Sequence, residues 1–107
     1  MIPEILKAGG LGFGSDYNAI EMINLLHDRG IRVPDQVSVV GFDDCIYAEY
    51  VRPGLTTIRQ NVTEKGKIAF HRLIRMIEGE SLTEMCVTAP IELVVRDSVK
   101  KRTNPAL

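Results

Sequence analysis

Apolar residues recur at steps of three and four in two segments of the chain, which is the spacing of one face of a helix. The first segment begins at Ser15 or Asp16, whose side chains can cap a helix, and ends at Gly30. The second follows Asn61, which can also cap a helix, and ends at Gly79. The pattern therefore predicts two amphipathic helices, of which the second has the clearer apolar face.

Short runs of β-branched and other apolar residues alternate with these helices. Residues 37–42 are almost continuously apolar, as in a strand that is covered on both faces of a parallel sheet. Residues 55–60 and 91–95 have the pattern of further strands, and a short strand is expected near residues 11–13. This order of strands and helices predicts an α/β layered fold.

The composition limits what such a fold can be. A chain of 107 residues that is 45% hydrophobic and 25% charged has room for one ordinary globular domain. Its formal charge of -1 provides no general attraction to nucleic acid or to anionic lipid. No apolar run approaches the ~20 residues that span a bilayer, and the first residues do not resemble a secretion leader. We therefore expect a cytoplasmic protein with no membrane partner.

Candidate catalytic and cofactor sites are weak. Gly9, Gly10, Gly12 and Gly14 lead into the first predicted helix, where backbone amides can cradle a phosphate. Ser15 stands where the third glycine of the dinucleotide fingerprint should be, and the lysine of a phosphate loop is absent, so a flexible N-terminal loop is the favoured interpretation. The serines and histidines form no nucleophilic motif, and no cysteine or histidine spacing indicates a metal site. We expect neither an enzyme nor a metal or other cofactor.

Two carboxylates follow the most apolar of the predicted strands. Asp43 and Asp44 lie where this strand ends, and in open α/β sheets that end faces the ligand crevice. Asp16, at the start of the preceding helix, is expected on the same rim. Carboxylates there can accept hydrogen bonds from ligand hydroxyls or hold a divalent ion. Ordinary capping and turn formation explains them equally well, so both interpretations stay open on the pattern alone.

The segment at residues 15–98 resembles the C-terminal part of the effector domain of LacI–GalR type transcription regulators. The resemblance rests on several motifs in one order: SDYNA at residues 15–19, RGIRVPDQVSVVGFDD at residues 29–44, PGLTTIRQ at residues 53–60 and ELVVRDS at residues 92–98. It implies a partial periplasmic-binding-protein-like (type I) α/β fold, with a mostly parallel sheet flanked by helices. Residues 1–14 are then expected to be an irregular N-terminal segment, and residues 99–107 a mobile tail.

The resemblance also implies a function. In this family the residue that matches Asp43 accepts hydrogen bonds from effector hydroxyls or ring nitrogens. The residues that match Ser15 and Asp16 lie on the same cleft, and the one that matches Gln60 borders it. We therefore expect these four residues to take part in binding a small effector, a sugar or a nucleobase-like molecule, in the full-length parent. DNA contact is expected only through an N-terminal helix-turn-helix domain that this chain lacks.

Self-association is a further expectation. By resemblance, the helix after Asn61 packs on a lobe that this chain does not contain, and bare apolar side chains gain about 1.5 to 3 kcal/mol each when they are buried. We expect a homo-oligomer, such as a dimer, whose interface is formed by Phe70, Leu73, Ile74 and Ile77. One alternative is a structural oligomer that binds no effector. A less favoured one is a nucleotide-binding enzyme that uses the glycine run at residues 9–14.

Overall fold

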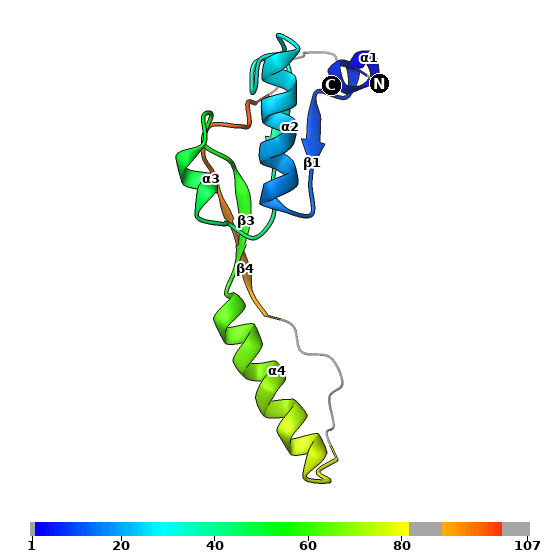
Figure 1. The fold of residues 1–107 in the computed structure, drawn as a ribbon, viewed down its shortest axis with the longest axis vertical. Helices are drawn as coiled ribbons and strands as arrows, with labels where there is room; N and C mark the ends of the chain where they lie inside the picture. The colour runs from blue at the N-terminus through cyan, green and yellow to red at the C-terminus, as the bar shows by residue number, and fades with distance from the viewer. Residues whose placement is uncertain (1, 82–88, 102–107) are drawn as a thin grey trace. The chain divides into compact units, whose positions relative to one another are not determined.

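A computed structural model describes residues 2–81 and 89–101, which fall into two compact units (Figure 1). The first unit consists of Met1–Arg59 and Leu93–Leu107, and the second of Gln60–Glu92. The boundary between the two units therefore falls within two strands, one on the way into the second unit and one on the way out.

The first unit begins with a helix and a short strand. Along the chain its elements are α1 (Ile2–Ala8), β1 (Gly10–Gly12), α2 (Asp16–Asp28), β2 (Ser38–Val40), α3 (Tyr47–Tyr50) and, at its end, β3 (Thr57–Gln60). The strand expected near residues 11–13 is present as β1. The N-terminal segment at residues 1–14, which was expected to be irregular, contains α1 and β1, and β1 pairs with β2. Backbone pairing with a distant strand stabilises a glycine-rich segment that has little strand propensity of its own.

The central strands of the first unit run parallel. Leu11 of β1 lies opposite Val39 of β2 in a parallel register. Isolated parallel bridges join Val40 to Thr56 and Asp43 to Arg59, so the chain after β2 also pairs with β3. This arrangement agrees with the parallel sheet that the apolar run at residues 37–42 predicts.

The core of the first unit is formed by side chains of α2, of the region around β2, of α3 and of the segment before β3. Its buried apolar residues are Ala19, Ile23, Leu26, Ile31, Val37, Val39, Ala48 and Leu55. Three of them belong to the face of α2 that the sequence pattern predicts, which confirms that helix. Ser15 caps its N-terminus, and Gly30 follows its C-terminus with a φ of 74°.

The last strand, β4 (Ile91–Val94), pairs with β3 in a two-stranded antiparallel sheet. The expectation of a mostly parallel sheet is therefore corrected at β3, where one neighbour is parallel and the other antiparallel. An alternating sequence pattern places residues on the faces of a strand but does not encode its direction. Beyond β4 the chain stays attached to the first unit, since the amide of Lys100 donates to Ser38 Oγ at 3.0 Å. Most of the predicted mobile tail, residues 102–107, lies outside the described residues.

The second unit contains the long helix α4 (Val62–Ile77). Asn61 caps it by accepting a hydrogen bond from the amide of Glu64 at 3.0 Å, and Gly79 follows its end with a φ of 85°. Both features confirm the helix that the sequence pattern predicts. None of its residues is buried. Across residues 2–81 and 89–101 there is no helix with the length and apolar character that a bilayer crossing needs.

Candidate functional site

The turn after β2 has an unusual backbone. Asp43 and Asp44 both lie in the left-handed region, with φ angles of 111° and 60°. This conformation is uncommon outside glycine, although aspartate adopts it more readily than most residues. The amide of Asp43 donates to the carbonyl of Ile58 at 2.8 Å, so the turn starts while the chain is still paired with β3. The turn leaves Asp43 exposed and Asp44 half-buried.

Asp16 lies beneath this turn, with only 1% of its surface exposed. Its amide donates to the carbonyl of Phe42 at 3.1 Å, which joins the start of α2 to the end of the strand region. Its carboxylate accepts two hydrogen bonds of 2.6 Å, one from the amide of Cys45 and one from the hydroxyl of Thr57. Both carboxylate oxygens are thus engaged by the protein itself. The sequence-based interpretation placed this carboxylate among the effector contacts, whereas here it points into the fold.

The space around the Asp16 carboxylate requires a glycine. A Cβ atom at Gly41 would collide with Oδ1 of Asp16 and would lie 2.9 Å from Cδ2 of Leu55. Both neighbours are fully buried. Gly41 therefore allows the carboxylate to reach the strand region, which the sequence pattern did not reveal.

Asp44 is held by two arginines. Its Oδ2 accepts from Nε of Arg59 at 2.8 Å, and its Oδ1 accepts from a terminal nitrogen of Arg96 at 2.8 Å. Burial raises the pKa of the Asp44 carboxyl, but the hydrogen bonds and positive charges of the two arginines outweigh burial, so its pKa lies below the ordinary value. Arg96 also donates to the carbonyl of Leu55 at 2.8 Å. Asp44 therefore cross-links the turn to β3 and to the chain after β4.

The two remaining predicted site residues have local partners. Ser15 is half-buried and accepts from the amide of Tyr17 at 3.2 Å, as an N-cap does. Gln60 belongs to the second unit, where its side-chain oxygen accepts from Nζ of Lys65 at 2.7 Å. Ser15, Asp16 and Asp43 meet at one edge of the first unit because the start of α2 is bonded to Phe42.

An exposed aromatic pair lies on the elements that flank this edge, and the sequence analysis did not identify it. The rings of Tyr17 in α2 and Tyr47 in α3 are 6.3 Å apart and meet edge to face at 62°. More than half of each side chain is exposed. Tyr17 directly follows Asp16, and that adjacency is the signal that could have indicated the pair. Aromatic rings with a hydroxyl tip can stack on a ligand and also hydrogen-bond to it.

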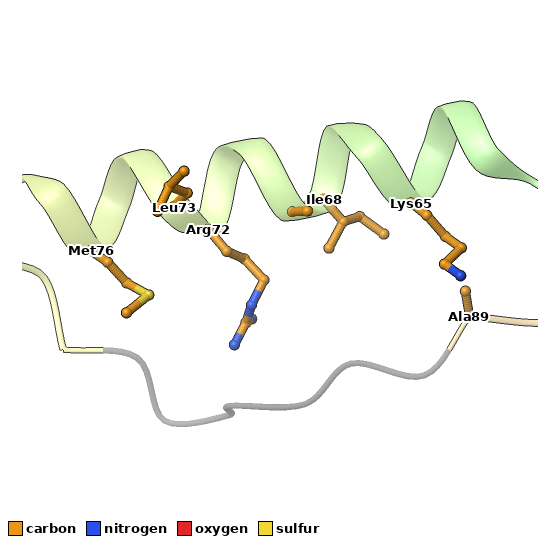
Figure 2. Close-up of a pocket in the computed structure, with 7 residues that line it drawn as sticks. Lys65, Ile68, Arg72, Leu73, Met76 and Ala89 are labelled. Carbon is orange, nitrogen blue, oxygen red and sulfur yellow. The ribbon is translucent and has the colours of Figure 1, made fainter.

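The predicted oligomer interface lies on α4, and its side chains are exposed. The exposed fractions are 62% for Phe70, 54% for Leu73, 37% for Ile74 and 71% for Ile77. A pocket of about 410 Å³ extends along the same helix, lined by Lys65, Ile68, Ala69, Arg72, Leu73, Met76 and Ala89. Figure 2 shows Lys65, Arg72 and Met76 extending from α4 on the side where Ala89 lies. The apolar surface of α4 therefore continues into a hollow with two positive charges.

The described part of the chain gives little support for a metal site or a nucleotide-binding loop. No three His, Cys, Asp or Glu side chains gather there in a group that could hold a metal ion. Within the glycine run at residues 9–14, Gly10–Gly12 form β1 and pair with β2. The run is therefore not the open phosphate loop that the nucleotide-binding alternative requires.

Comparison with known proteins gives the family. Residues 3–99 match the model of the family described as "Periplasmic binding protein-like domain". The chain is 39% identical over 87 residues to the HTH-type transcriptional repressor PurR of Vibrio parahaemolyticus, a match that covers 81% of this chain and 26% of that protein. The chain therefore spans about a quarter of the length of this relative.

Solved structures agree with this match. The transcriptional regulator CelR in its cellobiose complex superposes with a TM-score of 0.77 at 30% identity, covering 84% of this chain and 28% of that one. The lac repressor dimer bound to operator superposes with a TM-score of 0.76 at 27% identity, covering 90% and 35%. These relatives are transcription regulators, not enzymes. The chain belongs to the periplasmic binding protein-like domain family, in the form found in LacI-type transcription regulators.

Proposed function

We propose that this chain forms part of the effector-binding and dimerisation region of a LacI-type regulator, and that the turn at Asp43 is one wall of the effector site. The main observation in favour is the placement of Asp43. It is exposed on a left-handed turn whose neighbours Asp16 and Asp44 are anchored by hydrogen bonds to the rest of the first unit. Because the backbone that carries Asp43 is fixed in this way, less freedom is lost when its carboxylate accepts hydrogen bonds from a ligand.

The chemistry of this edge fits a polar ring-shaped ligand. A carboxylate offers about four lone-pair sites, which suits the adjacent hydroxyls of a sugar or the edge of a nucleobase. The hydroxyl of Ser15 lies at the same edge, and Gln60 is proposed to border the site. The likeness to CelR, which was solved with cellobiose, supports a sugar. The opposite wall of the cleft is proposed to come from the parent protein outside this segment.

Regulation in the parent follows from the same assignment. We propose that the effector favours one arrangement of the two lobes and so biases the spacing of two DNA-reading heads in a homodimer. The lac repressor dimer bound to operator, a relative of this fold, supports a dimer that contacts DNA. DNA contact would come only from an N-terminal domain outside this chain. A regulator of this kind would act in the cytoplasm.

Replacing Asp43 by Ala tests the effector site. In the regulator that contains this segment, we expect Asp43→Ala to weaken binding of the cognate sugar or nucleobase about a hundredfold or more, equal to a few kcal/mol. Isothermal titration calorimetry with cellobiose, with sucrose and with adenine as a generic purine base measures this. Asp35→Ala is the matched control, since Asp35 is an exposed carboxylate with two loose ion pairs of 3.7 and 3.8 Å. Equal affinities for the Asp43→Ala variant and the unaltered protein would reject the assignment.

The exposed face of α4 favours a second candidate, a structural oligomer formed through Phe70, Leu73, Ile74 and Ile77. Light scattering on this chain tests it. We expect an oligomer at micromolar concentration, with Leu73→Ser shifting the mass toward the monomer and the polar substitution Lys67→Ser leaving it unchanged. A monodisperse monomer for the unaltered chain would reject self-association through this face.

A further inference from the structure

We infer that Asp16 is a positioning residue: its buried carboxylate holds the Asp43 turn in its binding geometry and does not itself contact the effector. The claim that the turn serves effector binding rests on the proposed function. The claim that Asp16 holds the turn does not. Asp16 was expected among the effector contacts on the strength of the family resemblance. Its surroundings in the structure point to a different role.

Asp16 is not accessible to a ligand. With 1% of its surface exposed and with hydrogen bonds of 2.6 Å to both carboxylate oxygens, it presents no surface to a ligand. Gly41 lies so close to Oδ1 that even a Cβ atom on it would collide with this oxygen. A ligand could reach this carboxylate only after the strand region had moved. The direct role is therefore left to Asp43, which the same edge exposes.

The hydrogen bond from the Cys45 amide to Asp16 lies at the end of the turn. Two consecutive non-glycine residues in the left-handed region persist only where the surrounding structure fixes them. The amide of Asp43 is fixed at the start of the turn by the carbonyl of Ile58, at 2.8 Å. The amide of Cys45, the first after the two left-handed residues, is fixed by Oδ2 of Asp16. Asp16 therefore determines where the turn ends.

Asp16 is itself fixed by two further hydrogen bonds. The hydroxyl of Thr57, the first residue of β3, donates to the other carboxylate oxygen of Asp16. The backbone amide of Asp16 donates to the carbonyl of Phe42. Asp16 thus connects the start of α2, the far end of the turn and β3 through one side chain. A carboxylate suits this place because it accepts from two donors at once, and charged acceptors form the stronger hydrogen bonds.

Nuclear magnetic resonance of this chain tests the positioning role without any ligand. We expect the amide proton of Cys45 to resonate far downfield and to exchange slowly. In Asp16→Asn, the side-chain oxygen can still accept from Cys45 and the amide group can donate to the Thr57 hydroxyl. The Cys45 resonance should then move upfield, because the charge is lost, while its exchange stays slow and Asp43 keeps its left-handed shifts. In Asp16→Ala, Cys45 exchange should accelerate at least tenfold and the Asp43 shifts should change.

Two results would overturn the inference. One is a Cys45 amide resonance that stays unchanged in Asp16→Asn, because the amide would then not be bonded to Asp16. The other is a folded Asp16→Ala variant that keeps the turn intact. Thr57→Val is the matched control: it removes the other partner of the same carboxylate, so the Cys45 resonance should persist. If Asp16→Ala does not fold, the comparison of Asp16→Asn with Thr57→Val decides the matter.

Binding of cellobiose to the regulator that contains this segment separates positioning from contact. We expect Asp16→Asn to stay within about threefold of the unaltered affinity, whereas Asp43→Asn loses tenfold or more. Equal losses for the two variants would mean direct contact by Asp16 and would overturn the inference. If no sugar or nucleobase binds, the proposed function fails, and the resonance measurements still decide whether Asp16 holds the turn.

Discussion

Gly41→Ala tests the packing beneath the candidate site. The added Cβ would collide with Oδ1 of Asp16 and approach Cδ2 of Leu55 to 2.9 Å. Overpacking a well-filled core costs about 1 to 3 kcal/mol. If Asp16 moves away instead, the Cys45 amide and the Thr57 hydroxyl lose a charged acceptor, at about 1.5 to 3 kcal/mol for each hydrogen bond. We therefore expect the free energy of unfolding to fall by about 3 to 5 kcal/mol, a large share of the ~5 to 15 kcal/mol of a typical domain.

Urea denaturation followed by circular dichroism measures this loss. Gly12→Ala is the control, because a Cβ there meets nothing within 4 Å and Gly12 does not have a positive φ. It should change the free energy of unfolding by less than about 1 kcal/mol. A loss in Gly41→Ala no larger than in Gly12→Ala would refute the packing argument.

A double-mutant cycle locates the cause of the loss. In an Asp16→Ala background the colliding carboxylate is absent, so Gly41→Ala should cost only its contact with Leu55. The two substitutions should therefore be non-additive by about 1 to 3 kcal/mol, as expected for residues in direct contact. Additive losses would show that Gly41 acts through something other than Asp16.

Two further predictions concern polar side chains, Asp44 and Ser98, whose hydrogen bonds join distant segments of the first unit. Because the pKa of Asp44 is lowered in the folded state, its stabilisation is complete above its ordinary pKa of 3.8 and is lost as the pH falls below that value. Asp44→Asn should therefore cost about 1 to 2 kcal/mol at pH 7 and flatten the acid limb of the stability curve, measured by urea unfolding between pH 7 and pH 3; an unchanged acid limb would contradict this. Ser98→Ala should cost about 2 to 4 kcal/mol, because the fully buried Ser98 hydroxyl bonds the amide of Thr56 and a carbonyl of β2, and a loss below 1 kcal/mol by thermal unfolding would contradict it.

The helices could be predicted from the sequence because their signals are local. Ser15 and Asn61 cap α2 and α4 as the residue pattern indicates, and a glycine follows each helix within two residues. The apolar spacing of α2 also identifies the residues that it buries. The position of Asp43 just after a buried strand could be predicted from the apolar run at residues 37–42. These features depend on a few residues that are close together in the chain.

The features that the sequence did not reveal depend on distant partners. Asp16 has the residue type of a ligand contact, and only its bonds to Cys45 and Thr57, 29 and 41 residues away, show that it points inward. The antiparallel direction of β4 relative to β3 is likewise not encoded in the residues of either strand.

Three consecutive residues of β3 each bind one of the three acids at the candidate site. Thr57 donates to the side chain of Asp16, Ile58 accepts from the backbone of Asp43, and Arg59 donates to the side chain of Asp44. A slip of this strand by one residue would reverse the facing of all three positions at the same time. The positions of the three acids are therefore coupled through β3. Any shift of β3 along its own axis would change the geometry of all three at once.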